Sequence, residues 1–243
     1  MYYFASDVHL GHGSATESAA REARFVSWLE MVSADAKAIF LVGDIFDFWF
    51  EYRRVVPKGF VRTLGKLAEL TGRGIEIHFL AGNHDMWTYG YLEQECGITV
   101  HREAFETVLE GKHVYMAHGH TLGRRPWLQR FMTAVFRSEC IRRGFVFLVH
   151  PNLAMRFGHW WSGSSRKAKS VSHVFRGEDE PLMGFAREYL ASHPETDLFV
   201  FGHIHVPVRQ KLGPHTEVSF LGEWFENPVY GVLGKEGFTL KKY

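Results

Sequence analysis

The sequence is poor in cysteine, in long apolar runs and in net charge. Cys96 and Cys140 are its only cysteines among 243 residues, which excludes a disulfide framework and predicts a reducing, cytosolic compartment. No apolar run approaches the roughly 20 residues that span a bilayer, and the first residues lack the basic segment that opens a secretory signal. The net charge of +1 points to no polyanionic partner by itself. A secreted disulfide-rich domain and an integral membrane protein are therefore not expected.

What is present is the composition of a globular protein. Hydrophobic residues make up 46% and charged residues 23% of the chain, which excludes a disordered tail protein and a collagen-like fibre. The length fits a single domain, or one domain that carries an insertion. We therefore predict one domain over residues 1–243.

Short apolar runs alternate with helical patterns along the chain. Residues 17–32 and 60–70 repeat apolar side chains at helical spacing. Near the end, Val229–Leu233 and Phe238–Lys242 flank a Gly-Lys-Glu-Gly turn that is typical of a β-hairpin. Strands that alternate with helices indicate an α/β protein with substantial parallel pairing. The runs that we predict to be buried strands are Tyr2–Ala5, Ala38–Val42, Ile75–Leu80, His113–Ala117, Leu198–Phe201 and Val218–Leu221.

Residues 122–175 depart from this alternation. They predict helices that begin near Pro126 and Pro151, followed by a loop rich in Ser, Gly and Lys. Between residues 124 and 169 the chain has ten Lys or Arg against one acidic residue, Glu139. The aromatic residues of the same stretch are Trp127, Phe131, Phe136, Phe145, Phe147, Phe157, Trp160 and Trp161. We interpret 122–175 as a basic, aromatic helical cap inserted into the domain.

Side chains of the kinds that bind metals follow five of the predicted strands. The clusters are Asp7-Val8-His9, Gly43-Asp44-Ile45-Phe46-Asp47, Gly82-Asn83-His84-Asp85, His118-Gly119-His120 and Gly202-His203-Ile204-His205. Ligands collect outside the carboxyl ends of strands in α/β sheets, so we expect the clusters to converge. Carboxylate, imidazole and amide donors suit Mn²⁺, Fe or Zn²⁺ better than Ca²⁺. Seven such ligands fit two ions that share a carboxylate, about 3.5–4 Å apart.

In this order, the motifs DVH, GDIFD, GNHD, HGH and GHIH resemble the five motifs of the calcineurin-like metallophosphoesterase superfamily. The resemblance implies an α/β sandwich of two mixed β-sheets flanked by helices, here with the inserted helical cap. It also implies two divalent ions, Mn²⁺ first and Fe, Zn²⁺ or Mg²⁺ as alternatives. The ligands that it assigns are Asp7, His9, Asp44 and His205 for one ion, and the bridging Asp44 with Asn83, His118 and His203 for the other.

The resemblance also assigns catalytic roles. His84 matches the motif histidine that contacts the phosphate and can protonate the leaving group, and Asp44 and Asn83 belong to the catalytic set through the metals. Asp47 and Asp85 match acids that orient ligands and turns. Two cations at such a site neutralise charge on the phosphate and lower the pKa of a bridging water. The resulting hydroxide can then attack in line.

Within the superfamily, the chain resembles the UDP-2,3-diacylglucosamine hydrolases of lipid A synthesis. The stretches FASDVHLG, VGDIFDFW and GHIHVPV, the later LGEW and the position of the insertion carry this resemblance. It implies cleavage of the pyrophosphate bond of a UDP-linked acylated sugar, giving UMP and 2,3-diacylglucosamine 1-phosphate. It also implies a cytoplasmic enzyme on the anionic inner-membrane face, whose cap aromatics line a slot for acyl chains. The polar cap residues that correspond to substrate contacts are Ser165, Arg166, Lys167 and Lys169.

Two departures from that narrower family keep a second reading open. His84 stands where its best-known members have Arg, and His120 stands where they have Asp. Both changes move the chain toward the general superfamily pattern. A soluble phosphoesterase that acts on a nucleotide, a phosphoprotein or another small phosphoester is therefore the alternative.

Two other classes of protein are less well supported. A nuclease could use the basic aromatic segment on nucleic acid, but long aliphatic stretches interrupt the basic residues, so a nucleic-acid partner is not expected. A catalytically inactive scaffold would have lost ligands, whereas this sequence keeps all seven together with His84.

Overall fold

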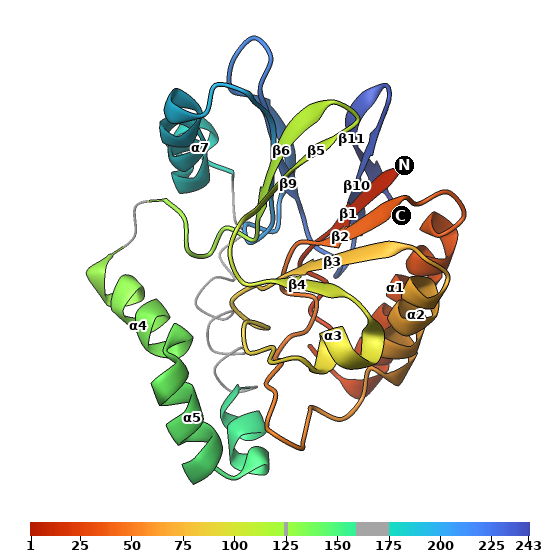
Figure 1. Ribbon diagram of the computed structural model, residues 1–243, viewed down its shortest axis with the longest axis vertical. Coiled ribbons are helices and arrows are strands. Elements are labelled where there is room, and N and C mark those ends of the chain that lie inside the picture. Colours follow the sequence, from red (N-terminus) through yellow and green to blue (C-terminus); the bar gives the residue numbers. More distant parts are fainter. Residues whose placement is uncertain (124–125, 159–174) are drawn as a thin grey trace.

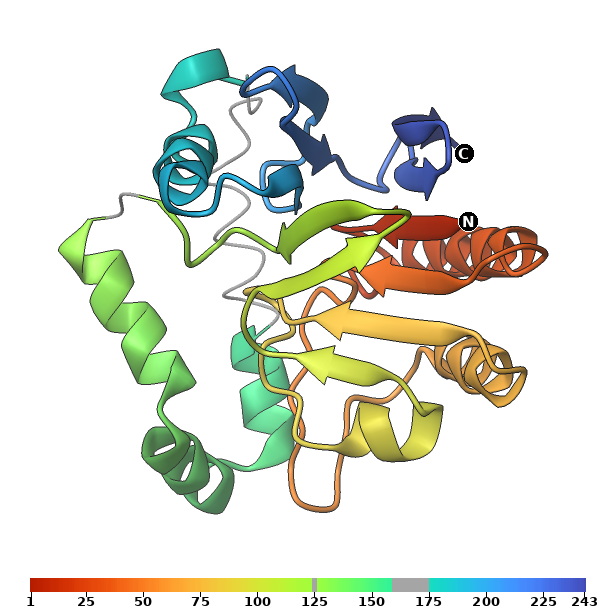
Figure 2. The same cartoon turned by 45° about the horizontal axis from the view of Figure 1, so that its top comes forward.

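The computed structural model describes residues 1–123, 126–158 and 175–243. Two β-sheets pack face to face, and helices cover their outer surfaces (Figures 1 and 2). This is the α/β sandwich of two mixed sheets flanked by helices that the sequence predicted.

The first sheet has six strands in the order β11-β10-β1-β2-β3-β4. Its strands β1 to β4 pair in parallel, and the predicted C-terminal hairpin pairs antiparallel with β1. The bounds are β1 Tyr2–Ala5, β2 Ala38–Leu41, β3 Glu76–Leu80, β4 Thr99–His101, β10 Val229–Gly234 and β11 Gly237–Lys242.

The second sheet has five strands in the order β5-β6-β7-β9-β8. The central strands β6, β7 and β9 are parallel, whereas β5 and β8 are antiparallel to their neighbours at the two edges. The bounds are β5 Phe105–Leu109, β6 Lys112–Ala117, β7 Thr196–Phe201, β8 Pro207–Lys211 and β9 Glu217–Leu221.

Three apolar layers hold the sandwich together. Helices α1, α2 and α3 cover the first sheet, α7 covers the second, and a third layer lies between the sheets. In that middle layer Phe4 stacks on Phe40 with ring centroids 5.0 Å apart. Helix α1 begins at a capping box, in which Ser14 and Glu17 satisfy each other's backbone N–H groups. The helix bounds are α1 Ala15–Val32, α2 Val61–Gly72, α3 Tyr91–Cys96 and α7 Pro181–Ser192, with the 3₁₀ turn η1 at Gly177–Asp179 before α7.

The helices that follow β6, within the sequence of the second sheet, stand beside the sandwich (Figures 1 and 2). They are α4, Trp127–Arg137, α5, Glu139–Leu148, and a helical segment over residues 151–158. Helices begin after Pro126 and at Pro151, as the sequence predicted. The indole nitrogen of Trp87 donates to the Phe136 carbonyl at 2.7 Å and anchors α4 to the sandwich. Among the described residues, no helix has both the length and the apolar character needed to cross a bilayer.

Candidate metal centre

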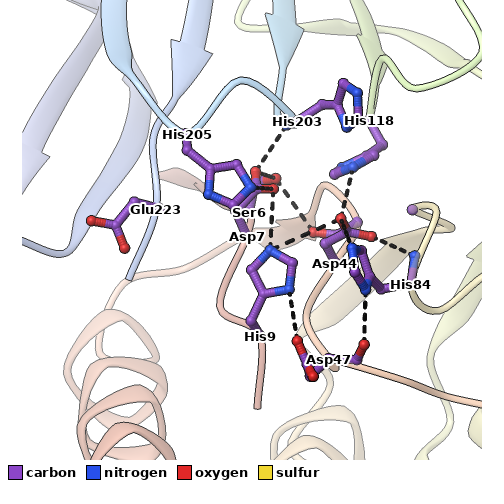
Figure 3. Close-up of polar contacts among 12 residues, drawn as sticks. Ser6, Asp7, His9, Asp44, Asp47, His84, His118, His203, His205 and Glu223 are labelled. Atoms are coloured by element: carbon purple, nitrogen blue, oxygen red, sulfur yellow. Dashed lines mark hydrogen bonds and ion pairs between the residues drawn. The ribbon is translucent and has the colours of Figure 1, made fainter. Parts of the chain in front are cut away.

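The five predicted clusters meet at one edge of the sandwich. Strands β1, β2 and β3 of the first sheet and β6 and β7 of the second all end there, and each continues into one of the clusters (Figure 3). The donor atoms form three groups, and the atoms within each group lie within 4.8 Å of one another. The groups are Asp7, His9 and His205; His9, Asp44 and His84; and Asp44, His118 and His203. The structure thus brings six of the seven predicted ligands together with His84. Asp44 and His9 each belong to two groups, which makes the cluster continuous.

The separations between donors are those of atoms that can share an ion. The Oδ2 atom of Asp44 lies 3.1 Å from Nε2 of His118 and 4.0 Å from Nε2 of His9. The Oδ1 atom of Asp7 lies 3.3 Å from Nε2 of His205. Ligand atoms each about 2.1 Å from one ion are themselves separated by roughly 3–4 Å. Oδ2 of Asp44 therefore lies within ligand-sharing distance of both His118 and His9.

Four buried polar atoms test whether metal ions fit this cluster. Oδ1 of Asp7, Nε2 of His9, Oδ1 of Asn83 and Nε2 of His118 have no hydrogen-bond partner within residues 1–123, 126–158 and 175–243. The Asp7, His9 and His118 atoms face oppositely charged groups without forming hydrogen bonds, and a buried polar atom whose hydrogen bond is not made costs about 1–3 kcal/mol. All four belong to predicted ligands, and they include the amide oxygen of the seventh, Asn83. A mixed set of carboxylate, imidazole and amide donors suits transition-metal ions, so the residues fit such a centre.

The backbone of the ligand residues is strained. Five predicted ligands have a positive φ, a region that side chains other than glycine rarely enter: Asp7 (55°), His9 (49°), Asp44 (53°), His203 (70°) and His205 (58°). Such conformations cost roughly 1–3 kcal/mol each and persist where the surrounding structure enforces them. This backbone conformation directs the side chains of the ligand residues into the cluster.

Glycine lets two segments approach the ligands closely. A Cβ atom on Gly82 would collide with the carboxylate of Asp44, and one on Gly202 would collide with the hydroxyl of Ser6. That hydroxyl donates to Oδ2 of Asp7 at 2.5 Å. The glycines at these two positions therefore make room for Asp44 and for the Ser6 hydroxyl that binds Asp7.

Neighbouring acids hold the ligands in place. Oδ1 of Asp85 accepts from the backbone N–H groups of Gly82 (2.8 Å) and Asp44 (3.2 Å). Its Oδ2 accepts from those of Ile45 (2.7 Å) and Phe46 (3.2 Å). One buried carboxylate thus joins the turns after β2 and β3. Oδ1 of Asp47 faces Nδ1 of His9 at 3.5 Å, so that Nε2 of this ring points into the cluster (Figure 3).

The ionisation of the cluster follows from its burial and its opposed charges. Burial opposes the charged form of Asp44, but His118 and His84 outweigh burial and hold the pKa of this carboxyl well below its usual range. Burial also disfavours protonated His9 and His118, yet the facing carboxylates raise the pKa of each to about 9. His84 differs, because burial lowers its pKa.

We expect metal binding to release protons at neutral pH. His9 and His118 have a pKa of about 9 in the metal-free protein, so both are protonated at pH 7, and an imidazole must lose that proton to become a ligand. Apparent metal affinity should therefore rise with pH, by up to about a hundredfold per unit between pH 6 and 8. Titration calorimetry of Mn²⁺ in two buffers of different ionisation enthalpy should count about two protons released. A heat that is the same in both buffers would contradict this protonation state.

Two residues that support His9 were not predicted. The ring of Phe225 stacks on His9 with centroids 5.5 Å apart and planes inclined by 12°. Arg21 of α1 lies 4.6 Å over that Phe225 ring and donates to the carbonyl oxygens of His9 (3.0 Å) and His12 (3.1 Å). A signal existed, since Arg21 occupies a position on the buried stripe of α1 with Phe25. An arginine on such a stripe needs polar partners inside the protein.

The other residues singled out in the sequence either lie at the rim of the cluster or fall outside the residues that the structure describes. His120 lies at the rim, with its ring centroid 5.5 Å from that of His118. Trp160 and Trp161 lie outside the described residues. The predicted substrate contacts Ser165, Arg166, Lys167 and Lys169 also lie outside them.

Comparisons with known proteins agree with the motifs. The sequence model of the calcineurin-like phosphoesterases matches residues 2–207. The chain is 39% identical to the UDP-2,3-diacylglucosamine hydrolase of Porphyromonas gingivalis, over 98% of this chain and 95% of that protein. It is 26% identical to the protein of the same name from Hahella chejuensis, with the same coverage. The protein of that name from Actinobacillus succinogenes is 25% identical over 92% of both chains.

Proposed function

Because this chain belongs to the calcineurin-like phosphoesterase family, we propose that it hydrolyses the pyrophosphate bond of UDP-2,3-diacylglucosamine and releases UMP and 2,3-diacylglucosamine 1-phosphate. The observation that carries the proposal is the 39% identity over nearly the full length of a relative with that name. The convergence of the donor groups supports it, since a pyrophosphate is an anion that such a centre can hold.

The proposed cofactors are two divalent ions, with Mn²⁺ the first expectation. When bound, such ions neutralise charge on phosphate oxygens and lower the pKa of water, which supplies the attacking hydroxide. The proposed ligands are Asp7, His9, Asp44 and His205 for one ion, and Asp44, Asn83, His118 and His203 for the other. Asp44 is the proposed bridge because it belongs to two of the donor groups and its carboxylate has two oxygens, whereas His9 directs only Nε2 into the cluster.

His84 is proposed to act directly on the substrate. Its Nδ1 donates to the carbonyl of Asp47 at 2.9 Å, and its backbone N–H donates to Oδ1 of Asp44 at 2.9 Å. These bonds fix the ring so that Nε2 faces Oδ2 of Asp44 at 3.9 Å (Figure 3). From this position Nε2 of His84 can contact the phosphate. It can donate a proton to the leaving oxygen only in the imidazolium form, which burial disfavours in the free protein and a bound phosphate anion stabilises.

Replacing His84 by alanine should lower kcat by roughly 10²–10⁴-fold, the usual contribution of a positioned acid or base. The metal content should stay at two ions, because His84 is not a proposed ligand. Steady-state kinetics and elemental analysis of the same preparation measure both quantities. His215→Ala, which removes an exposed histidine, is the control. Loss of metal together with activity would reassign His84 as a ligand.

Residues 122–175 are proposed to form a cap inserted into a single domain of residues 1–243. Several apolar side chains of its described helices are exposed, among them Trp127 (76%) and Phe147 (88%). Such side chains can cover acyl chains of the substrate or enter the membrane interface. The enzyme is therefore proposed to work at the anionic cytoplasmic face of the inner membrane. Ser165, Arg166, Lys167 and Lys169 remain the predicted polar contacts of the cap with the substrate.

The direct test is release of UMP from UDP-2,3-diacylglucosamine by the purified protein with Mn²⁺, beside a chromogenic phosphodiester. We expect rapid UMP release that EDTA abolishes and added Mn²⁺ restores. Activity on the simple ester alone would instead support a soluble phosphoesterase with another substrate. His84 and His120, which depart from the hydrolase pattern, are the residues that favour this alternative.

A further inference from the structure

A cavity of about 1030 Å³ lies between the sandwich and the cap, and none of the proposed metal ligands lines it. Its walls come from the loop after β2, the segment before and within α3, and the cap helix α5. Arginines and aromatic residues dominate its lining: Arg53, Arg54, Arg142, Arg143, Tyr89 and Phe147. We refer to these six residues and the space between them as the arginine pocket.

Hydrogen bonds hold the floor of the arginine pocket in place. The chain segments that follow Asp47 and His84 run side by side. Two backbone hydrogen bonds of 3.0 Å join them, from Trp49 N–H to the His84 carbonyl and from Glu51 N–H to the Trp87 carbonyl. The buried carboxylate of Glu51 accepts from the Trp49 indole at 3.0 Å and from the backbone N–H groups of Tyr89 and Tyr91. Glu51 is four positions after Asp47, which spans at most about 14 Å of extended chain. The pocket is therefore near the metal centre but separate from it.

Positive charge in the arginine pocket exceeds the negative charge around it. The guanidinium of Arg142 lies 3.3 Å from the centroid of the Tyr89 ring, and Arg142 and Arg143 share the carboxylate of Glu139. Arg53 and Arg54 are exposed, and the described part of the chain offers neither of them a carboxylate partner. The Glu51 carboxylate is already bound by N–H donors. The charge of the arginine pocket therefore favours an anion over a neutral or cationic ligand.

Exposed apolar side chains lie next to Arg142 and Arg143 on helix α5. Phe147 is 88% exposed and its neighbour Leu148 is 79% exposed, while Val55 on the facing loop is 49% exposed. A free phosphate could use the arginines but would leave this surface in water. A ligand that joins a phosphate to an acyl chain satisfies both, because basic and apolar residues side by side match the headgroup and the hydrocarbon of an anionic membrane.

We propose that the arginine pocket binds the headgroup phosphate of an anionic phospholipid, with Phe147 and Leu148 in the adjoining acyl region. The proposal deepens the proposed function, in that it names the contact by which an enzyme with a lipid substrate reaches the membrane. It does not involve the metal centre. Helix α5 of the cap would then lie at the bilayer surface.

The test measures binding of the full-length protein to vesicles of phosphatidylcholine alone or with 30% phosphatidylglycerol. The double variant Arg53→Gln/Arg54→Gln should bind the anionic vesicles about 30-fold more weakly than the unmodified chain, since each basic residue at such a surface contributes about a fivefold effect. The control Arg62→Gln/Arg73→Gln changes the net charge equally, at an exposed position of α2 and at the exposed residue that follows this helix, and should stay within about threefold.

A second pair of variants tests the apolar part. Phe147→Ser should weaken vesicle binding about tenfold, whereas Val61→Ser, which removes a side chain that is 76% exposed on α2, should leave it unchanged. Asp44→Asn should bind vesicles as well as the unmodified chain does. This variant separates the two proposals, because vesicle binding is read without turnover.

Three results would overturn the proposal. Equal losses in the test and control variants would show diffuse charge attraction rather than a site. Equal binding of the unmodified chain to both kinds of vesicle would exclude a headgroup phosphate. Binding of soluble glycerol 3-phosphate with a Kd below about 0.1 mM, lost in Arg53→Gln/Arg54→Gln, would make the ligand a free phosphorylated molecule instead of a membrane lipid.

Discussion

Replacing Asp44 by asparagine should lower kcat by at least about 10³-fold and leave the protein folded. The reason is charge, since a metal centre supplies several kcal/mol of transition-state stabilisation and each 1.36 kcal/mol is tenfold in rate. Asn keeps the shape of Asp44 and can still accept the N–H of His84, which Oδ1 accepts at 2.9 Å. What it loses is the negative charge that faces His118 at 3.1 Å. Bound metal, measured by elemental analysis, should fall from two ions to one or none.

The control for this experiment is Asp179→Asn, which removes an exposed carboxylate from η1. It should keep both ions and full turnover. If Asp44→Asn retained two ions and normal kcat, Asp44 would not be the shared ligand. The substrate assignment would survive that result, because it depends on the relatives and on UMP release.

Replacing Asp85 by alanine should destabilise the protein by roughly 3–5 kcal/mol, one of the largest effects of a single change outside the apolar core. The carboxylate of Asp85 is fully buried and accepts four backbone N–H groups from the turns after β2 and β3. Without it four donors lose a partner, and the lower end of the cost of a buried unpaired donor, about 1 kcal/mol each, already adds up to about 4 kcal/mol. Urea denaturation of the metal-free protein measures the change.

Asp197→Ala is the matched control for the stability experiment. The carboxylate of Asp197 accepts a single N–H group, from His113 at 2.8 Å, at an exposed site. Its loss should cost about 1 kcal/mol or less. An equal destabilisation by both variants would mean that the Asp85 hydrogen bonds are replaced by water and that the two turns hold their shape without them.

The strands that lead into the metal centre were predictable because each is a buried run followed by polar residues. The sequence-based bounds of β1, Tyr2–Ala5, agree with the structure, and those of β2 and β3 differ by one residue. The edge strands β4, β5 and β8 were missed. β4 has three residues, and most positions of β5 and β8 alternate between exposed and half-buried, so none of the three forms an apolar run.

The residues of the metal centre were predictable from the sequence, but their backbone conformation and supporting hydrogen bonds were not. Residue type and order identified the donors, because few other arrangements place carboxylates and imidazoles after successive strands. The left-handed backbone of Asp7 and His203 leaves no trace in the sequence, since nothing but the fold enforces it. The same is true of Asp85, whose four N–H partners come from two turns that are about forty residues apart.

The pairing of β1 has a consequence for how the protein acquires its metals. β1 pairs with β2 on one side, but on the other it pairs with β10, so that Tyr2 lies opposite Leu233. Asp7 follows β1, and its proposed partner His205 follows β7 near the other end of the chain. A growing chain on the ribosome therefore has Asp7 long before it has the histidines that complete the site. Metal can enter a finished centre only after the segment that contains His205 has been synthesised, so loading follows the synthesis of β7 and does not guide the folding of the first strands.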